Sequence, residues 1–257
     1  LVQEQSVEGP KKNGLPQGSV LATILYNIYT NDQPIHQQTR QFIYADDTAV
    51  AAQGRTFNEV EVKLTDALGD LALYYDKNHL KPNPTKTQVC AFHLRNKHAR
   101  RSLEVEWRGQ MLEHNKTPKY LGVRLDRTLS YRYHCQDVKK KVSARNNIIR
   151  KLTNTKWGAQ PHTLRISALA LCFSAAEFEA PVWSNSAHAK NVDVALNETV
   201  RIISGCLKPT PIEEVYPIAG IAPPPIRRKV TSEVERKKQE TDRRHTPYMT
   251  TKLSQAD

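Results

Sequence analysis

A change in hydrophobic periodicity near Tyr133 divides the sequence into two parts of different fold class. Before Tyr133, short alternating apolar runs typical of strands are mixed with helical patterns, whereas after it the apolar residues recur at helical spacing. The expected strands cover 1–7, 41–44, 48–52, 87–93, 103–107 and 120–125, and the expected helices cover 19–29, 56–78, 133–155, 161–178, 187–204, a short segment from 210 and a frayed segment after 223. A loop is expected over 11–18, from its Gly and Pro content. The sequence therefore predicts an α+β region followed by an all-α region.

The clearest single element is the helix that begins after Thr56. Thr56 and Glu59 have the spacing of a capping box, in which each side chain satisfies a backbone N–H of the first turn. The apolar residues that follow recur every three or four positions and end before a Pro-containing loop. They are Val60, Leu64, Leu68, Leu71 and Tyr75.

Charge narrows the class of partner. Lys and Arg number 38 and Asp and Glu number 26, so the formal net charge is +12. The segment from Val138 to Ala176 contains eight basic residues and no acidic one. A solvated helix usually mixes both signs, so a stretch of one sign favours contact with a phosphate backbone over a protein that merely happens to be basic.

Length and cysteine content limit the number of domains and the cellular compartment that the sequence is compatible with. The 257 residues fit one domain, or one domain with a smaller companion, and no apolar run approaches the length of about 20 residues that spans a membrane. The chain begins with Leu1 and carries no signal-peptide pattern, which suggests a piece of a longer product. Its four cysteines are widely spaced and predict reduced thiols of an intracellular protein, with nuclear and cytoplasmic ribonucleoprotein placement both open.

Two adjacent carboxylates stand between two of the short expected strands. The run Tyr44-Ala45-Asp46-Asp47 is predicted to form a hairpin tip, where neighbouring carboxylates repel each other unless a cation neutralises them. Mg²⁺ prefers such oxygen ligands, and two-metal phosphoryl-transfer sites are built from them. Asp is also common in ordinary turns, so the pair alone does not distinguish a catalytic role from a structural one.

The surrounding residues resemble the reverse transcriptase of jockey-like non-LTR retrotransposons over about residues 1–240. The similar segments are Gly14 to Leu21 with Tyr26 to Asp32 (motif B), Tyr44 to Asp47 (motif C), Lys81 to Thr87 (motif D), Lys119 to Asp126 followed by His134 (motif E), and Asn197 to Thr199 with Gly205 to Pro211 (thumb). The resemblance implies a partial polymerase palm, a small antiparallel sheet with packed helices, followed by an all-α thumb. Its divisions are palm motifs B to E over 1–130, a helical thumb-like region over 131–222 and a basic tail over 223–257.

The resemblance also implies roles for individual residues. Asp46 and Asp47 would be catalytic and hold Mg²⁺, with Mn²⁺ an alternative, while the partners would be an RNA template, a DNA primer, dNTPs and the element RNA. The remaining assignments are nucleotide or template contacts for Gln17, Gly18, Tyr44 and Lys86, a primer grip for Tyr120, Leu121 and Gly122, and nucleic-acid backbone contacts for Lys139, Lys140, Arg145, Arg150 and Lys151. Lys86 is equally compatible with a solvated loop lysine.

Two departures from the family pattern bear on activity. Thr23 stands where the family usually has proline, and the first aspartate is Asp32, so no motif A aspartate precedes motif B. The fingers and motif A are therefore expected upstream of these residues, and this chain alone is expected to be inactive. A non-catalytic or domesticated nucleic-acid-binding remnant is the alternative. A viral RNA-copying polymerase fits less well, because such enzymes usually carry glycine where Ala45 stands.

Overall fold

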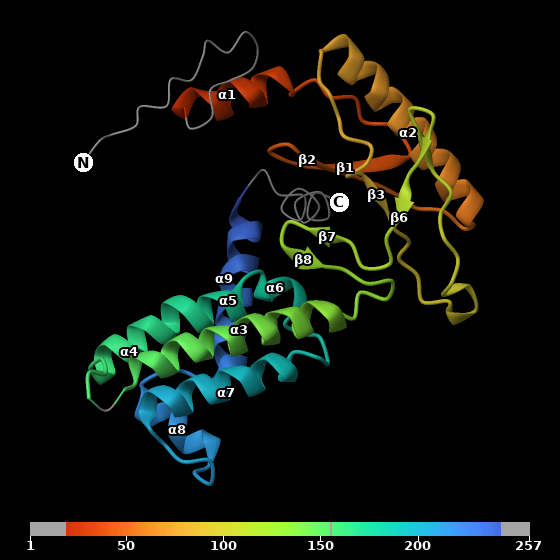
Figure 1. Cartoon of the computed structure of the whole chain (residues 1–257). Helices are drawn as coiled ribbons and strands as arrows, with labels where there is room; N and C mark the ends of the chain where they lie inside the picture. Colours follow the sequence, from red (N-terminus) through yellow and green to blue (C-terminus); the bar gives the residue numbers. More distant parts are fainter. Residues whose placement is uncertain (1–18, 155, 243–257) are drawn as a thin grey trace, which may run out of the picture. The chain divides into compact units, whose positions relative to one another are not determined.

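The computed structural model describes residues 19–154 and 156–242, and it is an α+β structure, as predicted (Figure 1). The chain forms two compact units. Unit 1 contains the described residues up to 91 together with 100–115, and unit 2 contains 92–99 together with the described residues from 116 onward. The strand predicted over 1–7 and the loop predicted over 11–18 lie outside the described residues. No helix of the described segments combines the length and apolar character that crossing a membrane requires.

Unit 1 combines two helices with three pairs of short strands. Strands β1 and β2 pair antiparallel, as do β4 and β5, while β3 and β6 pair in parallel. The elements are α1 (Val20–Tyr29), β1 (Thr39–Tyr44), β2 (Asp47–Ala52), α2 (Phe57–Lys77), β3 (Gln88–Val89), β4 (Glu106–Trp107), β5 (Gln110–Met111) and β6 (Glu113–His114). The strands predicted over 87–93 and 103–107 are each reduced to two residues. Alternate burial of Leu103, Val105 and Trp107 nevertheless persists, because side-chain packing and not a backbone ladder sets it.

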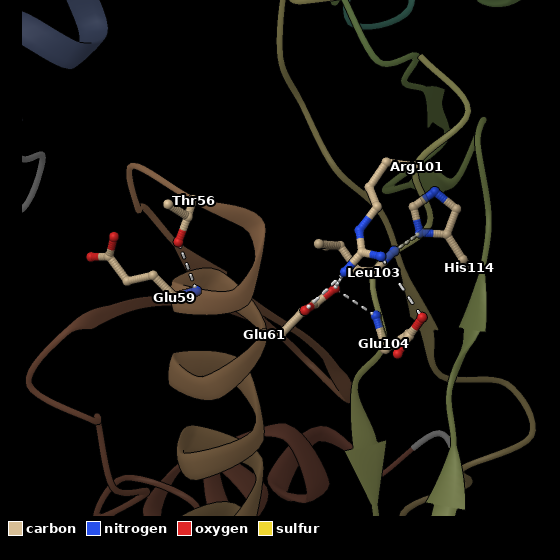
Figure 2. Close-up of polar contacts among 7 residues, drawn as sticks. All are labelled: Thr56, Glu59, Glu61, Arg101, Leu103, Glu104 and His114. Atoms are coloured by element: carbon tan, nitrogen blue, oxygen red, sulfur yellow. Dashed lines mark hydrogen bonds and ion pairs between the residues drawn. The ribbon is translucent and has the colours of Figure 1, made fainter. Parts of the chain in front are cut away.

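Helix α2 organises the core of unit 1. Its predicted cap at Thr56 is confirmed, while the Glu59 carboxylate accepts from the Arg55 N–H at 2.8 Å, one residue before the predicted position. Thr56 accepts a hydrogen bond from the Glu59 backbone N–H at 3.2 Å, as Figure 2 shows. Buried Leu64 packs with the apolar residues of the strand segment, and the Trp107 indole N–H donates to the Leu68 carbonyl at 2.9 Å. The helix is therefore held by both an apolar face and polar contacts, the usual source of helix stability in a protein.

An ion pair joins the start of α2 to the segment before β4. The carboxylate of Glu61 accepts from the Arg101 guanidinium at 3.1 Å and from the Glu104 backbone N–H at 3.0 Å (Figure 2). Beside it, the Leu103 N–H donates to His114 Nδ1 at 3.1 Å. These contacts satisfy backbone donors that lack a strand partner, so the segment is fixed without a longer sheet.

Tyrosine side chains tie the end of α1 to α2. The Tyr74 hydroxyl donates to Asp32 at 2.8 Å, and Tyr29 donates to the carbonyl of Asn78. Burial, together with the hydrogen bond to Asp32, raises the pKa of Tyr74 to about 12, so this hydroxyl stays a donor at neutral pH. Helix α1 itself buries no residue among the described ones, and Val20 is 87% exposed.

Unit 2 contains a small hairpin beside a bundle of helices (Figure 1), together with a short 3₁₀ turn. The elements are η1 (Asn96–His98), β7 (Lys119–Tyr120), β8 (Val123–Arg124), α3 (Arg132–Leu152), α4 (Pro161–Ala168), η2 (Leu169–Phe173), α5 (Ser174–Glu177), α6 (Ala180–Trp183), α7 (Lys190–Ser204), α8 (Ile212–Ala219) and α9 (Pro224–Thr241). The predicted helices after Tyr133 are confirmed. The one predicted over 161–178 contains a π-helical turn at η2.

The core of unit 2 lies between α3 and α7 and encloses a polar network. Asn146 is fully buried, donates to the Ala195 carbonyl at 3.0 Å and accepts from the Thr199 hydroxyl at 2.7 Å. Around it pack apolar residues spaced at helical intervals on both helices, and these are Val138, Val142, Ile149, Val192, Leu196 and Val200. The network satisfies its buried polar groups, as a stable core requires.

Helix α9 is fastened to the bundle by two arginines. Arg228 pairs with Asp193 and lies over the Trp183 ring at 5.8 Å, while Arg227 pairs with Glu177 and lies over Phe173. The Arg228 side chain is 8% exposed, so its charge is neutralised within the protein. These two arginines of the predicted basic tail therefore pack α9 against the bundle. Separately, the four cysteines of the chain are free thiols, as predicted.

Candidate active site and nucleic-acid interface

The two carboxylates of interest stand on the tip of the β1–β2 hairpin. Tyr44 pairs with Asp47 at the end of the ladder, and Ala45 and Asp46 form the turn between them, which confirms the predicted hairpin. Ala45 has a φ of 51°, in the left-handed region that is unfavourable for a residue with a Cβ. The turn is tight, and it places both aspartates at one end of the ribbon.

Both carboxylates are free to bind a ligand. Asp46 and Asp47 are exposed, and neither forms a hydrogen bond or an ion pair with any residue in the described part of the chain. Two unpaired carboxylates are suitable oxygen donors for a hard divalent cation. Within the described segments, however, no third Asp, Glu, His or Cys gathers with them, so they provide only part of a metal-binding set.

A tyrosine that the motif analysis did not single out lies near this tip. Tyr26, on α1, is partly buried, and burial, the negative charge of Asp46 and the neighbouring Tyr75 together raise its pKa. The phenol is therefore protonated at neutral pH. It also lies close enough to Asp46 for the negative charge of that carboxylate to raise its pKa. Its signal in the sequence was its position within the run Tyr26 to Asp32 that continues motif B.

Of the other predicted nucleotide or template contacts, Tyr44 and Lys86 are described, while Gln17 and Gly18 lie outside the described residues. Tyr44 is 66% exposed beside the aspartates. Lys86 is exposed on a turn in which the Asn83 side chain accepts from the Thr85 N–H and hydroxyl, at 3.1 and 2.6 Å. Its role in binding stays a prediction, because either a phosphate or water can meet an exposed lysine.

The predicted primer-grip residues form a hairpin in unit 2. The strand expected over 120–125 is wrong as one continuous element: Tyr120 pairs with Val123, and the chain reverses through Leu121 and Gly122. Both turn residues have positive φ, 44° and 89°, a combination typical of two-residue hairpin loops. Leu121 projects at the tip and is 38% exposed, while Val123 is buried.

Helix α3 divides its five candidate backbone-contacting residues among different faces. Arg145 donates to the carbonyl of Leu171 in η2, and Arg150 pairs with Glu198 on α7. Lys139, Lys140 and Lys151 are exposed and form no ion pair within the described segments. Because a helix turns about 100° per residue, Lys140 and Lys151 lie together on the side opposite the buried residues.

Comparison with known proteins identifies the family. A profile described as reverse transcriptase (RNA-dependent DNA polymerase) matches residues 2–125, the segment that contains the β1–β2 and β7–β8 hairpins. This segment belongs to the reverse transcriptase family. The resemblance to non-LTR retrotransposon reverse transcriptases is confirmed by this match and by the relatives of the chain.

The relatives are proteins of mobile elements. The chain is 28% identical over 214 residues to the "Probable RNA-directed DNA polymerase from transposon BS" of Drosophila melanogaster. It is 26% identical over 220 residues to the "RNA-directed DNA polymerase from mobile element jockey" of the same species, and 31% identical over 153 residues to the jockey protein of Drosophila funebris. Each D. melanogaster match covers 78% of this chain and 23% of the relative, so the chain spans about a quarter of those proteins. No solved structure matches it.

Proposed function

We propose that this chain is the later part of the palm, together with the thumb, of an RNA-directed DNA polymerase from a non-LTR retrotransposon. In that assignment 1–130 carry palm motifs B to E, 131–222 form the thumb and 223–257 form a basic tail. The observation that carries the proposal is the pair of exposed carboxylates on the β1–β2 hairpin, which have no partner among residues 19–154 and 156–242, within a segment that matches the reverse transcriptase family. The exposed lysines of α3 support it, because the product and template of such an enzyme are polyanions.

Asp46 and Asp47 would hold a divalent cation, Mg²⁺ or Mn²⁺, through their carboxylate oxygens. When bound, such ions activate the primer 3′-hydroxyl and stabilise charge on the leaving pyrophosphate. The chain's own groups would orient the reactants around that centre: Tyr44 beside the aspartates, and Gln17 and Gly18 at the template and nascent base pair. Lys86 would face the triphosphate.

The unpaired lysines are the best candidates for contact with the template–primer duplex. Lys140 and Lys151 stand about three helical turns apart on the outward side of α3, while Lys139 is exposed about a quarter of a turn away from them. Arg145 and Arg150 are engaged with Leu171 and Glu198, so they would contribute chiefly to the shape of the helix surface. Removing one lysine that binds a phosphate should reduce the slope of log affinity against log salt by about 0.9.

We further propose that the 257 residues alone polymerise little or not at all. A two-metal site needs carboxylates from more than one segment, and the described residues gather no third acidic ligand at the hairpin. The alternative function, a non-catalytic nucleic-acid-binding module, is favoured by one specific observation. The acid-free segment from Val138 to Ala176 carries its charge independently of the aspartates.

The decisive experiment is Mg²⁺-dependent dNTP incorporation on an RNA template with a DNA primer. The chain would be compared with a natural upstream-extended form that includes the family's first catalytic aspartate. Asp46→Ala would be made in both forms, with Asp66→Ala as the matched control, because Asp66 is an exposed aspartate on α2 with the same charge. We expect incorporation only in the extended form, abolished by Asp46→Ala and retained in Asp66→Ala.

Other outcomes decide between the two functions. Incorporation by the chain alone that depends on Asp46 would contradict the proposed inactivity. No incorporation by either form, with duplex binding retained, would favour the binding module. Salt titrations of Lys140→Ala/Lys151→Ala should show a slope lower by nearly two units, and an unchanged slope would contradict the thumb assignment.

A further inference from the structure

The β7–β8 hairpin has a backbone donor that its own ribbon cannot satisfy. Arg124 pairs with Lys119 in the ladder, and the neighbouring hydrogen bond runs from the Leu125 N–H to the Pro118 carbonyl at 2.9 Å. In an antiparallel ribbon, alternate N–H groups point away from the partner strand. The Arg124 N–H is one of these, and it donates instead to Nδ1 of His134 at 3.3 Å. A side chain of α3 therefore completes the hydrogen bonding of the hairpin.

His134 is held in one orientation by its surroundings. It is 4% exposed, and its ring lies 5.8 Å from that of Trp183, which is fully buried. The Trp183 indole N–H in turn donates to the Phe178 carbonyl at 3.1 Å. The Phe178 ring covers the turn of the hairpin, where a Cβ on Gly122 would stand 2.7 Å from Cε1 of Phe178. The hairpin therefore contacts the helical part of unit 2 at two points: its outer edge bonds to His134, and its turn packs against Phe178.

The bond to Arg124 requires a neutral imidazole with its proton on Nε2, since Nδ1 must accept. Burial lowers the pKa of His134, and the positive charges of Arg124 and Lys119 lower it further, against the opposing effect of Asp137. The acceptor form is therefore the stable form at neutral pH. Asp137 also pairs with the Arg124 side chain at 2.8 Å, so α3 holds this residue through both backbone and side chain.

We propose that His134 is a positioning residue for the primer end: it fixes the β7–β8 hairpin so that the exposed tip at Leu121 meets the primer 3′ terminus. The inference rests on the proposed function, because it takes Tyr120, Leu121 and Gly122 as the primer grip. It adds a residue outside that hairpin and gives it a specific task. His134 acts through Arg124 and does not itself touch the nucleic acid.

The test compares two ligands of equal length, an RNA–DNA duplex with a recessed primer 3′ end and a hairpin-closed duplex without a primer end. The ratio of their affinities for the full chain measures recognition of the end separately from contact with the duplex. His134→Phe keeps a ring beside Trp183 and removes the acceptor, whereas His134→Asn keeps an acceptor and removes the ring. We expect His134→Phe to lower the ratio about tenfold, the usual consequence of a part-buried donor left without a partner. His134→Asn should restore most of the ratio.

Controls separate this role from general stability. His162→Phe, an exposed histidine at the start of α4, should leave the ratio unchanged, and Lys140→Ala should weaken both ligands equally. Hydrogen exchange in α3 checks that each variant is folded. A normal ratio in His134→Phe, or a loss in His134→Asn equal to that in His134→Phe, would overturn the inference. A wild-type chain that binds both ligands equally would instead overturn the primer-grip assignment itself.

Discussion

Replacing Gly122 by alanine tests directly whether the β7–β8 hairpin is seated on the helices of unit 2. Gly122 has a φ of 89°, and a Cβ there would lie 2.7 Å from Cε1 and 3.2 Å from Cζ of Phe178. Real Cβ atoms do not approach another carbon this closely, so the hairpin or the ring must move. Two separate costs therefore follow from one methyl group, a conformational cost and a packing cost.

The two costs can be estimated separately. A Cβ in the left-handed region costs about 1–2 kcal/mol. Forcing a methyl group into a packed contact costs about 1–3 kcal/mol. Phe178 is 51% exposed, so its ring can swing outward, which keeps the packing cost near the lower end of that range. Gly122→Ala should therefore lower the free energy of unfolding of unit 2 by about 2–4 kcal/mol.

Gly205 provides the matched control within the same unit. It ends α7 with a φ of 69°, and no atom of the described residues lies within 4 Å of the position that a Cβ would take. Gly205→Ala should thus incur the conformational cost alone, about 1–2 kcal/mol. Native-state hydrogen exchange of the α3 and α7 amides is the suitable assay, because two compact units can unfold separately and one global transition would not resolve them.

The double variant Gly122→Ala/Phe178→Ala completes the test. Without the ring, the methyl group has room, so the two substitutions should together cost less than the sum of the single ones. A Gly122→Ala cost equal to that of Gly205→Ala, or strictly additive costs in the double variant, would refute the proposed seat on Phe178.

Three further outcomes are expected. The pKa of His134 is lowered in the folded state, so its neutral form stabilises unit 2 fully above about pH 6.5, and this contribution falls as the pH drops toward the folded pKa. Urea unfolding across that range should show a decrease in the free energy of unfolding, and the decrease should be smaller in His134→Asn. Asn146→Ala removes one of the hydrogen bonds to the Ala195 carbonyl and one acceptor of the Thr199 hydroxyl, and it opens a cavity. Hydrogen exchange in α3 should therefore report a loss of unfolding free energy of about 2–4 kcal/mol. Gly69→Ala, in the interior of α2 with no atom of the described segments near the new methyl group, should instead raise the thermal midpoint of unit 1 by the equivalent of about 0.5–1 kcal/mol, and a lower midpoint would contradict the helical packing described for this position.

Local patterns in the sequence were sufficient to predict several elements. The helices of unit 2 follow from apolar spacing, and the cap at Thr56 follows from a four-residue signature. The β1–β2 hairpin was predicted from two short apolar runs around the aspartates. In each case the decisive interactions join residues that are close in the chain, which is why a single sequence contains the information.

Interactions between distant residues set the parts that were not predicted. Arg145 and Arg150 resemble free cations in a basic run, but their partners, Leu171 and Glu198, lie 26 and 48 residues away. The break of the strand expected over 120–125 also depends on distant groups. Leu121 adopts an unfavourable backbone conformation that only the surrounding contacts of the folded unit can hold.

The distribution of unfavourable backbone conformations links these details to function. Seven residues other than glycine have positive φ in the described part of the chain. One is Ala45, at the aspartate hairpin, and three more lie between the β7–β8 turn and the start of α3, namely Leu121, Leu129 and Tyr131. Such residues persist only where the surrounding structure over-determines them, and they concentrate at functional sites.

Hydrogen bonds hold the segment between the β7–β8 turn and α3, which contains Leu129 and Tyr131, in its unfavourable conformation. Burial alone would raise the pKa of Asp126, but hydrogen bonds from the backbone and hydroxyls of Ser130 and Thr128 lower it, so the carboxylate is firmly bonded within this turn. Ser186 donates to the Ser130 carbonyl at 2.6 Å, and His134 accepts from the Arg124 N–H of the preceding strand, β8. Ala45 and Leu121 lie in the turns of the two hairpins, which supports the proposal that the first hairpin carries the chemistry and the second meets the primer end.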